Sequence, residues 1–251
     1  MRRNLPLPLL LLPGLMNDER VWDPIRQALP AGRTVVVAET HTADSISALA
    51  ASALSLMPAG PFAVAGFSLG GYVALEVCRQ AFERVAGVAL LDTGARADSE
   101  EAKDNRRRMV AALGAGTASL AQVASGFAAR IIHPSHAQDA QMLELLADMA
   151  RAVGSEGFVR QQTAAMNRQD SRQLLAELRC PALVLCGRED QVTPPALSEE
   201  LSSLLAGDVE LVVIPECGHM STLERPTTVT EAFNRWIDRA DRSQQAARTG
   251  A

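Results

Sequence analysis

The chain has 251 residues, of which 47% are hydrophobic and 21% are charged, with a net charge of −5. These values are typical of a globular protein that is long enough to bury a sizeable core. The acidic balance does not suggest a nucleic-acid partner, and no apolar run reaches the roughly 18 residues of a membrane span. Four cysteines at spacings that fit neither a zinc knuckle nor a short disulfide framework indicate a reducing compartment, so we expect a cytoplasmic protein.

Short apolar runs alternate with helix-forming segments along most of the chain. The predicted strands are Leu7–Leu12, Thr34–Ala38, Pro61–Phe67, Val85–Leu91, Pro181–Cys186 and Val209–Ile214. The predicted helices between and after them are Glu19–Leu29, Ser45–Met57, Leu69–Ala81, Pro195–Leu205 and Thr227–Arg239. This alternation predicts an α/β fold, with about six mostly parallel strands in one sheet and helices on both faces.

The alternation stops between residues 95 and 178, where no β-branched run occurs. Four helices are expected there, at about Ser99–Leu113, Ala118–Arg130, Gln138–Val153 and Gly157–Arg168. We therefore expect a core made of residues 1–94 and 179–242, with residues 95–178 inserted as a helical cap over the site. Nine arginines and one lysine in the cap balance ten acids, which indicates no preference for charged substrates. The small, polar tail 243–251 is expected to be disordered.

The segment Gly66-Phe67-Ser68-Leu69-Gly70 fits the pattern G-x-S-x-G and lies between a predicted strand and a predicted helix. In that context the chain must turn sharply, and the glycines let strand and helix approach closely. Ser68 at the apex then presents its hydroxyl near the positive end of the following helix. This arrangement predicts a serine nucleophile.

A serine nucleophile needs a base and an acid that orients the base. His219 follows the last predicted strand on a loop at the edge that carries Ser68, and it is the predicted base. The acid is either Asp190 or Asp92, because each comes just after a strand; Glu189 is a weaker alternative. His41 also lies just past a strand and could line the rim of the site.

His133 and His136 have an H-x-x-H spacing that resembles a metal site. Pro134 interrupts any helix between them and no third ligand is near in the sequence. We therefore expect no metal site, and no motif predicts an organic cofactor.

The order Ser68, Asp190, His219 resembles that of the α/β-hydrolase superfamily, and the resemblance covers nearly the whole chain. Within the superfamily it is similar to small capped, cofactor-free esterases and enol-lactonases. The matching motifs are Pro13-Gly14-Leu15, the segment around Ser68, Gly187-Arg188-Glu189-Asp190 with Val192-Thr193-Pro194, and Cys217-Gly218-His219. The resemblance implies that Asp190 is the triad acid and that the backbone N–H groups of Leu15 and Leu69 form an oxyanion hole. It further implies hydrolysis of a small carboxylic ester or lactone through an acyl-serine intermediate.

Two departures from the family pattern affect these expectations. Many relatives have His-Gly where this chain has Pro13-Gly14, so a hydrogen bond that supports the oxyanion hole is expected to be missing. Only about six residues precede the first strand, so the N-terminal β-hairpin of relatives is expected to be absent. Ser68 stands where dehalogenases and epoxide hydrolases of similar shape need an aspartate. Thioesterase, C–C hydrolase and perhydrolase activities stay open, as does a non-catalytic ligand-binding or signalling role on the same fold.

Overall fold

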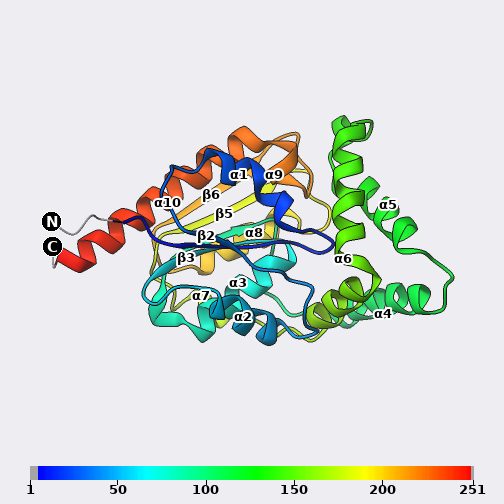
Figure 1. Cartoon of the computed structure of the whole chain (residues 1–251), viewed down its shortest axis with the longest axis horizontal. Helices are drawn as coiled ribbons and strands as arrows, with labels where there is room; N and C mark the ends of the chain where they lie inside the picture. Colours follow the sequence, from blue (N-terminus) through cyan, green and yellow to red (C-terminus); the bar gives the residue numbers. More distant parts are fainter. Residues whose placement is uncertain (1–4, 250–251) are drawn as a thin grey trace.

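A computed structural model describes residues 5–249 and shows one sheet of six parallel strands in the order β2-β1-β3-β4-β5-β6 (Figure 1). The strands are β1 (Leu9–Leu12), β2 (Val35–Val37), β3 (Phe62–Phe67), β4 (Val85–Leu91), β5 (Ala182–Gly187) and β6 (Val209–Ile214). Residues 5–8 form no strand. The predicted six-stranded parallel α/β sheet is therefore confirmed.

Helices cover both faces of this sheet (Figure 1). On one face lie η1 (Glu19–Trp22), α1 (Asp23–Ala28), α9 (Ser221–Glu224) and α10 (Pro226–Thr249). On the other lie α2 (Ile46–Ser55), α3 (Leu69–Gln80), α7 (Arg172–Leu175) and α8 (Pro195–Leu204). A short turn of helix, η2 (Phe82–Arg84), connects α3 to β4. Successive strand residues point to opposite faces, so Leu9 and Leu11 pack under α10 while Leu10 and Leu12 pack under α3.

The segment between β4 and the short helix α7 is made of helices, as its sequence predicted. They are α4 (Glu100–Gly114), α5 (Leu120–Ile131), η3 (Pro134–His136) and α6 (Ala140–Met166). Gly154 interrupts α6 with a left-handed φ of 72°, so α6 is two helical pieces that meet near the expected break. In Figure 1 α4, α5 and α6 gather at one end of the sheet, opposite to the C-terminal part of α10.

The C-terminal helix α10 is longer than expected, because it continues to Thr249. The expectation of a disordered tail from Ser243 is therefore wrong for residues 243–249, while residues 250 and 251 lie outside the described part. The reason is that Gln, Ala and Arg are good helix formers, and extending an existing helix adds a hydrogen bond for each residue that is fixed.

Within residues 5–249, no helix combines the length and the apolar character needed to cross a membrane. All four cysteines fall in this range and carry free thiols. Burial raises the pKa of the thiols of Cys180 and Cys186 to about 11. These thiols are therefore protonated near neutral pH and are poor nucleophiles.

Candidate active site

Ser68 lies at the tight turn between β3 and α3, with a left-handed φ of 53° and a ψ of −116°. The turn is possible because two glycines allow close contact: a Cβ at Gly66 would overlap the carbonyl of Gly70, and a Cβ at Gly70 would overlap the carbonyl of Leu12. Thr93, just after β4, donates a hydrogen bond of 2.8 Å to the Ser68 carbonyl and fixes the turn from the neighbouring strand. The serine side chain makes no capping bond to its own helix, so its hydroxyl is free for other partners.

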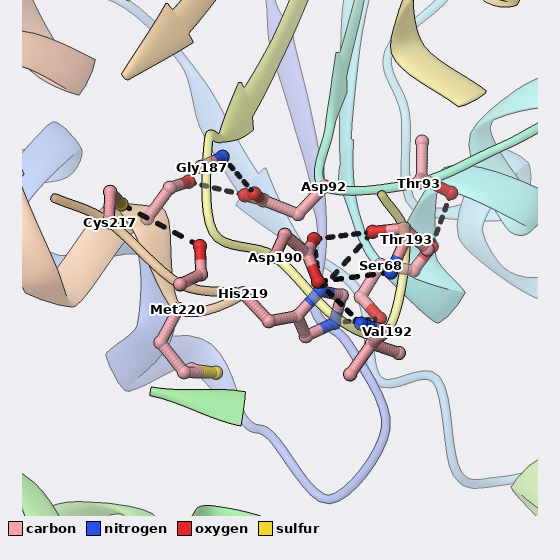
Figure 2. Close-up of polar contacts among 12 residues, drawn as sticks. Ser68, Asp92, Thr93, Gly187, Asp190, Val192, Thr193, Cys217, His219 and Met220 are labelled. Carbon is pink, nitrogen blue, oxygen red and sulfur yellow. Dashed lines mark hydrogen bonds and ion pairs between the residues drawn. The ribbon is translucent and has the colours of Figure 1, made fainter. Parts of the chain in front are cut away.

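His219 bridges Ser68 and Asp190 (Figure 2). Its Nε2 lies 2.8 Å from the Ser68 Oγ, and its Nδ1 lies 2.7 Å from Asp190 Oδ2. Both distances are within hydrogen-bond reach. The three residues come from loops after β3, β5 and β6, which end at the same edge of the parallel sheet. The structure therefore brings together the predicted nucleophile, base and acid.

The Asp190 carboxylate is held by its own loop. Its Oδ1 accepts hydrogen bonds from the backbone N–H groups of Val192 (2.8 Å) and Thr193 (3.0 Å), and its Oδ2 accepts one from the Thr193 hydroxyl (2.6 Å). Burial alone would raise the pKa of Asp190, but the charge and hydrogen bond of His219, with the bonds from Thr193, hold this pKa below its usual value. Asp190 is therefore ionised where an imidazolium would need a counter-charge.

Asp92, the alternative acid, does not contact His219 directly (Figure 2). Its carboxylate accepts hydrogen bonds from the Gly187 N–H (3.0 Å) and from the Ser221 hydroxyl, and its side chain is fully buried. The pKa of Asp92 is raised well above its usual value. Burial is the larger cause, and repulsion from the nearby Asp190 charge is the second. Asp92 thus serves as a structural bridge between the strand ends.

Asp92, Asp190 and His219 are also the one group of three potential metal ligands among residues 5–249. Every side-chain nitrogen and oxygen in this group already forms a hydrogen bond within the protein. The hydrogen-bonding capacity of this group is therefore used within the protein.

The raised pKa of Asp92 makes a testable contribution to stability. A group whose folded-state pKa lies above its unfolded value loses its favourable contribution as the pH rises from the unfolded pKa, about 3.9, through the folded one. Asp92→Asn cannot ionise, so we expect the variant to gain stability over the native protein above pH 4. The gain should grow by about 1.4 kcal/mol per pH unit between the two pKa values. Urea unfolding at several pH values, followed by tryptophan fluorescence, measures it; a constant difference from pH 4 to 7 would contradict this assignment.

The loop that carries His219 is organised by Glu224, a residue that no sequence motif had marked as functional. The buried Glu224 carboxylate accepts hydrogen bonds from the N–H groups of Gly218 (3.1 Å) and Met220 (2.9 Å), on either side of the histidine. It also accepts one from the N–H of His133 (2.7 Å), which follows α5. In addition, His219 donates its own N–H to the Ile131 carbonyl at 2.6 Å. The histidine loop is therefore attached to the inserted helices.

The predicted oxyanion-hole donors, Leu15 and Leu69, border the same cavity as Ser68. Within residues 5–249, neither backbone N–H has a hydrogen-bond acceptor. Leu69 is the first residue of α3, where a free N–H is expected at the positive helix end. Both groups are thus available to an oxygen bound beside Ser68.

The loop around Leu15 is fixed by Gln161, a fully buried residue of α6. Its Oε1 accepts the N–H of Met16 at 3.0 Å, and its Nε2 donates to the Gly14 carbonyl and to Thr40 Oγ1, each at 3.3 Å. Met16 has a strained φ of 56° that this bond helps to hold. A side chain of α6 therefore holds the loop that contains Leu15.

The other residues named from the sequence lie elsewhere. His41 borders a separate pocket with Glu39 and Arg20, so it does not line the Ser68 cavity. The His133 Nδ1 pairs with the Ser135 hydroxyl at 2.7 Å, and neither His133 nor His136 joins a third ligand in the described chain. The exposed Glu189 accepts the Cys217 N–H at 3.0 Å and does not reach His219.

A cavity of about 400 Å³ opens onto Ser68. Core residues around Ser68 form one side, and apolar residues of the inserted helices, such as Met109, Phe127 and Phe158, form another. This volume falls at the small end of ligand-binding pockets. The cavity can therefore hold a small organic molecule against the serine.

The parallel sheet with its serine at the β3–α3 turn defines an α/β hydrolase, and the comparison with protein families gives the same result. The model of the alpha/beta hydrolase family matches residues 9–232. The chain belongs to this family.

Individual relatives include esterases. The chain is 26% identical over 197 residues to a pimeloyl-[acyl-carrier protein] methyl ester esterase of Neisseria meningitidis, a match covering 76% of this chain and 74% of that protein. The structure of the present chain is similar to that of a malate-bound thermophilic esterase from Thermogutta terrifontis. The TM-score is 0.82 and the identity is 30%, with 94% of this chain and 90% of the other covered. An enol-lactonase from Burkholderia xenovorans LB400 shares the fold, with a TM-score of 0.80, 22% identity and 94% of each chain covered.

Proposed function

We propose that the protein hydrolyses a small carboxylic ester or lactone through an acyl-serine intermediate. The observation that carries this proposal is the relay from Ser68 through His219 to Asp190. It lies beside a cavity that is also lined by Leu15 and Leu69, whose backbone N–H groups have no acceptor among residues 5–249. The esterase activity named for two of the relatives supports it as well.

In the proposed reaction His219 Nε2 takes the proton from the Ser68 hydroxyl while the oxygen attacks the substrate carbonyl. The N–H groups of Leu15 and Leu69 stabilise the oxyanion that forms. Asp190 keeps the proton on His219 Nδ1, so that Nε2 is free to accept, and then stabilises the imidazolium. His219 gives the proton to the leaving alcohol and afterwards activates the water that releases the acid. No step requires a metal or an organic cofactor.

We further infer that residues 95–178 act as a cap on a core formed by residues 1–94 and 179–242. Two sets of hydrogen bonds between the cap and the core support this inference. Gln161 holds the loop that contains Leu15 and Met16, and Ile131 and His133 hold the loop that carries His219. The cap also contributes the apolar wall of the cavity, which keeps water away from the acyl group.

The test is a series of p-nitrophenyl esters of rising acyl length, run beside a set of lactones and with fluorophosphonate labelling of the native protein. We expect labelling at Ser68 and turnover that is best for short acyl groups, because the cavity is small. Slow labelling and no turnover of any ester or lactone would instead favour a ligand-binding or signalling role.

The contact of Gln161 with the oxyanion loop leads to a prediction for Gln161→Met. Because one oxyanion donor is then less well positioned, we expect kcat to fall about 10- to 100-fold, less than the 10²–10³ typical of a lost donor, with KM little changed. Gln141→Met is the matched control, since Gln141 is exposed on the same helix. Steady-state kinetics with a short-chain ester and thermal melts measure both; a loss confined to KM would contradict a role in transition-state stabilisation.

A further inference from the structure

The cavity over Ser68 contains two arginines, both from the inserted helices: Arg106 from α4 and Arg130 from α5. No aspartate or glutamate among the described residues lines this cavity. The remaining lining is largely apolar, with two glutamines and a tyrosine. The balanced charge of the whole insert therefore conceals a local excess of positive charge at the site.

The guanidinium of Arg106 is fixed in place and only partly neutralised. Its Nε donates to Asp98 Oδ2 at 2.7 Å, but Asp98 Oδ1 also pairs with Arg168 at 2.5 Å. One buried carboxylate thus serves two guanidinium groups, which leaves one positive charge uncompensated. The Arg106 Nη2 forms no hydrogen bond with any described residue. A preorganised cation with free donors suits a bound anion.

Gln162 adds an unused donor beside this cation. Its Oε1 accepts a hydrogen bond of 2.6 Å from Arg106 Nη1, and because arginine only donates, this orients the amide. The Gln162 Nε2 is then buried without a hydrogen-bond partner among the described residues. Unpaired buried donors are rare in folded proteins, and they often indicate a missing ligand or water.

Arg130 is exposed and borders the cavity, and among residues 5–249 it pairs with no carboxylate. Arg107, next to Arg106 on α4, instead forms a surface ion pair with Asp104 and lies outside the cavity lining. Arg130 can therefore meet an anion at the cavity without first breaking an ion pair.

We propose that Arg106 and Arg130 form a subsite for an anionic group, so that the substrate is an ester or lactone bearing a carboxylate or a similar small anion away from the scissile carbonyl. This inference rests on the proposed esterase function. The ester binds at Ser68 on the core side, and the anion binds on the cap side. Charge-assisted hydrogen bonds to arginine then set the preference for such substrates over neutral ones.

The test compares monoethyl adipate with ethyl 6-amino-6-oxohexanoate, its neutral amide analogue, and with an ester that carries a terminal phosphate on a chain of similar length. For the native protein we expect kcat/KM to be about 10- to 100-fold higher for monoethyl adipate than for the amide. Arg106→Gln and Arg130→Gln should each remove most of this preference by raising KM for the anionic ester, and leave the neutral ester little changed. A similar preference for the phosphate ester over the neutral amide would show that the subsite recognises negative charge and not the shape of a carboxylate.

The controls keep the two proposals distinguishable. Arg107→Gln should keep the preference, and Arg130→Lys should restore part of what Arg130→Gln loses. If Arg106→Gln does not fold, the Arg130→Gln variant alone provides the test, because Arg130 is exposed. Equal kcat/KM for monoethyl adipate and its amide would overturn the anion subsite, even if both esters are hydrolysed rapidly. If no ester is hydrolysed, calorimetry of monoethyl adipate against the amide decides: selective binding that Arg130→Gln abolishes supports the subsite without the esterase function, and equal binding overturns it.

Discussion

Replacing Asp190 with asparagine is expected to lower kcat for an activated ester by about 10⁴-fold. The reason lies in how the loop holds this side chain. The backbone N–H groups of Val192 and Thr193 both donate to Oδ1, so in Asp190→Asn the amide oxygen must occupy that place. The NH₂ group then faces His219 Nδ1 and donates to it. His219 is left with its proton on Nε2, where it cannot accept the serine proton.

Asp92→Asn is the matched control for that experiment, because both aspartates are buried at neighbouring strand ends. We expect it to change kcat little, since the hydrogen bonds of Asp92 go to Gly187 and Ser221 and not to His219. Steady-state kinetics of both variants, with thermal melts to confirm folding, make the comparison. A larger loss for Asp92→Asn than for Asp190→Asn would transfer the acid role to Asp92.

Ser68→Ala is expected to have the largest effect, a loss of about 10⁶-fold in kcat, as for other serine hydrolases whose nucleophile is removed. The stability of the fold should be nearly unchanged, because the Ser68 hydroxyl does not cap α3. KM, or the affinity for a non-reactive ester analogue, should also change little, since the cavity walls are intact. Kinetics and calorimetry on one preparation measure both quantities; substantial residual turnover that cannot be assigned to contamination would rule out Ser68 as the nucleophile.

The sequence predicted the sheet and the relay because both depend on local patterns. The run Val85–Leu91 is fully apolar, and Val209–Ile214 is apolar except for Glu210. Both runs are bounded by polar turns and match β4 and β6 residue for residue. The G-x-S-x-G turn needs glycine where Gly66 and Gly70 touch neighbouring backbone, so its pattern is visible in a single stretch. Parallel strands then place the residues after each strand at one edge.

The choice between Asp190 and Asp92 could not be made from the residues alone, because both follow strands at that edge. The family resemblance favoured Asp190, and the hydrogen bond of Asp190 to His219 Nδ1 agrees with it. What separates the two is the position of Thr193 and Ser221, whose hydroxyls bond to one aspartate each. Such contacts depend on loop conformation, which short sequence patterns do not specify.

The supporting residues were invisible in the sequence for a different reason. Gln161 contacts Met16 across 145 positions, and Glu224 contacts His133 across 91. From sequence alone, a glutamine or glutamate on a helix is expected to face solvent. Its buried contacts become visible only when the packing of the helical segment 95–178 is known. The same holds for Arg106 and Arg130, whose charges cancel in a count over the insert but face one cavity in the fold.

Mass spectrometry of protein quenched during turnover can detect the covalent acyl intermediate that we propose on Ser68. With a slowly deacylated activated ester, we expect a mass increase equal to the acyl group on the peptide that contains Ser68, rising within the first turnovers and clearing once substrate is spent. Ser68→Ala should carry no adduct under the same conditions. An adduct on another residue, or turnover by the native protein without any adduct in the burst phase, would rule out Ser68 as the acylated nucleophile.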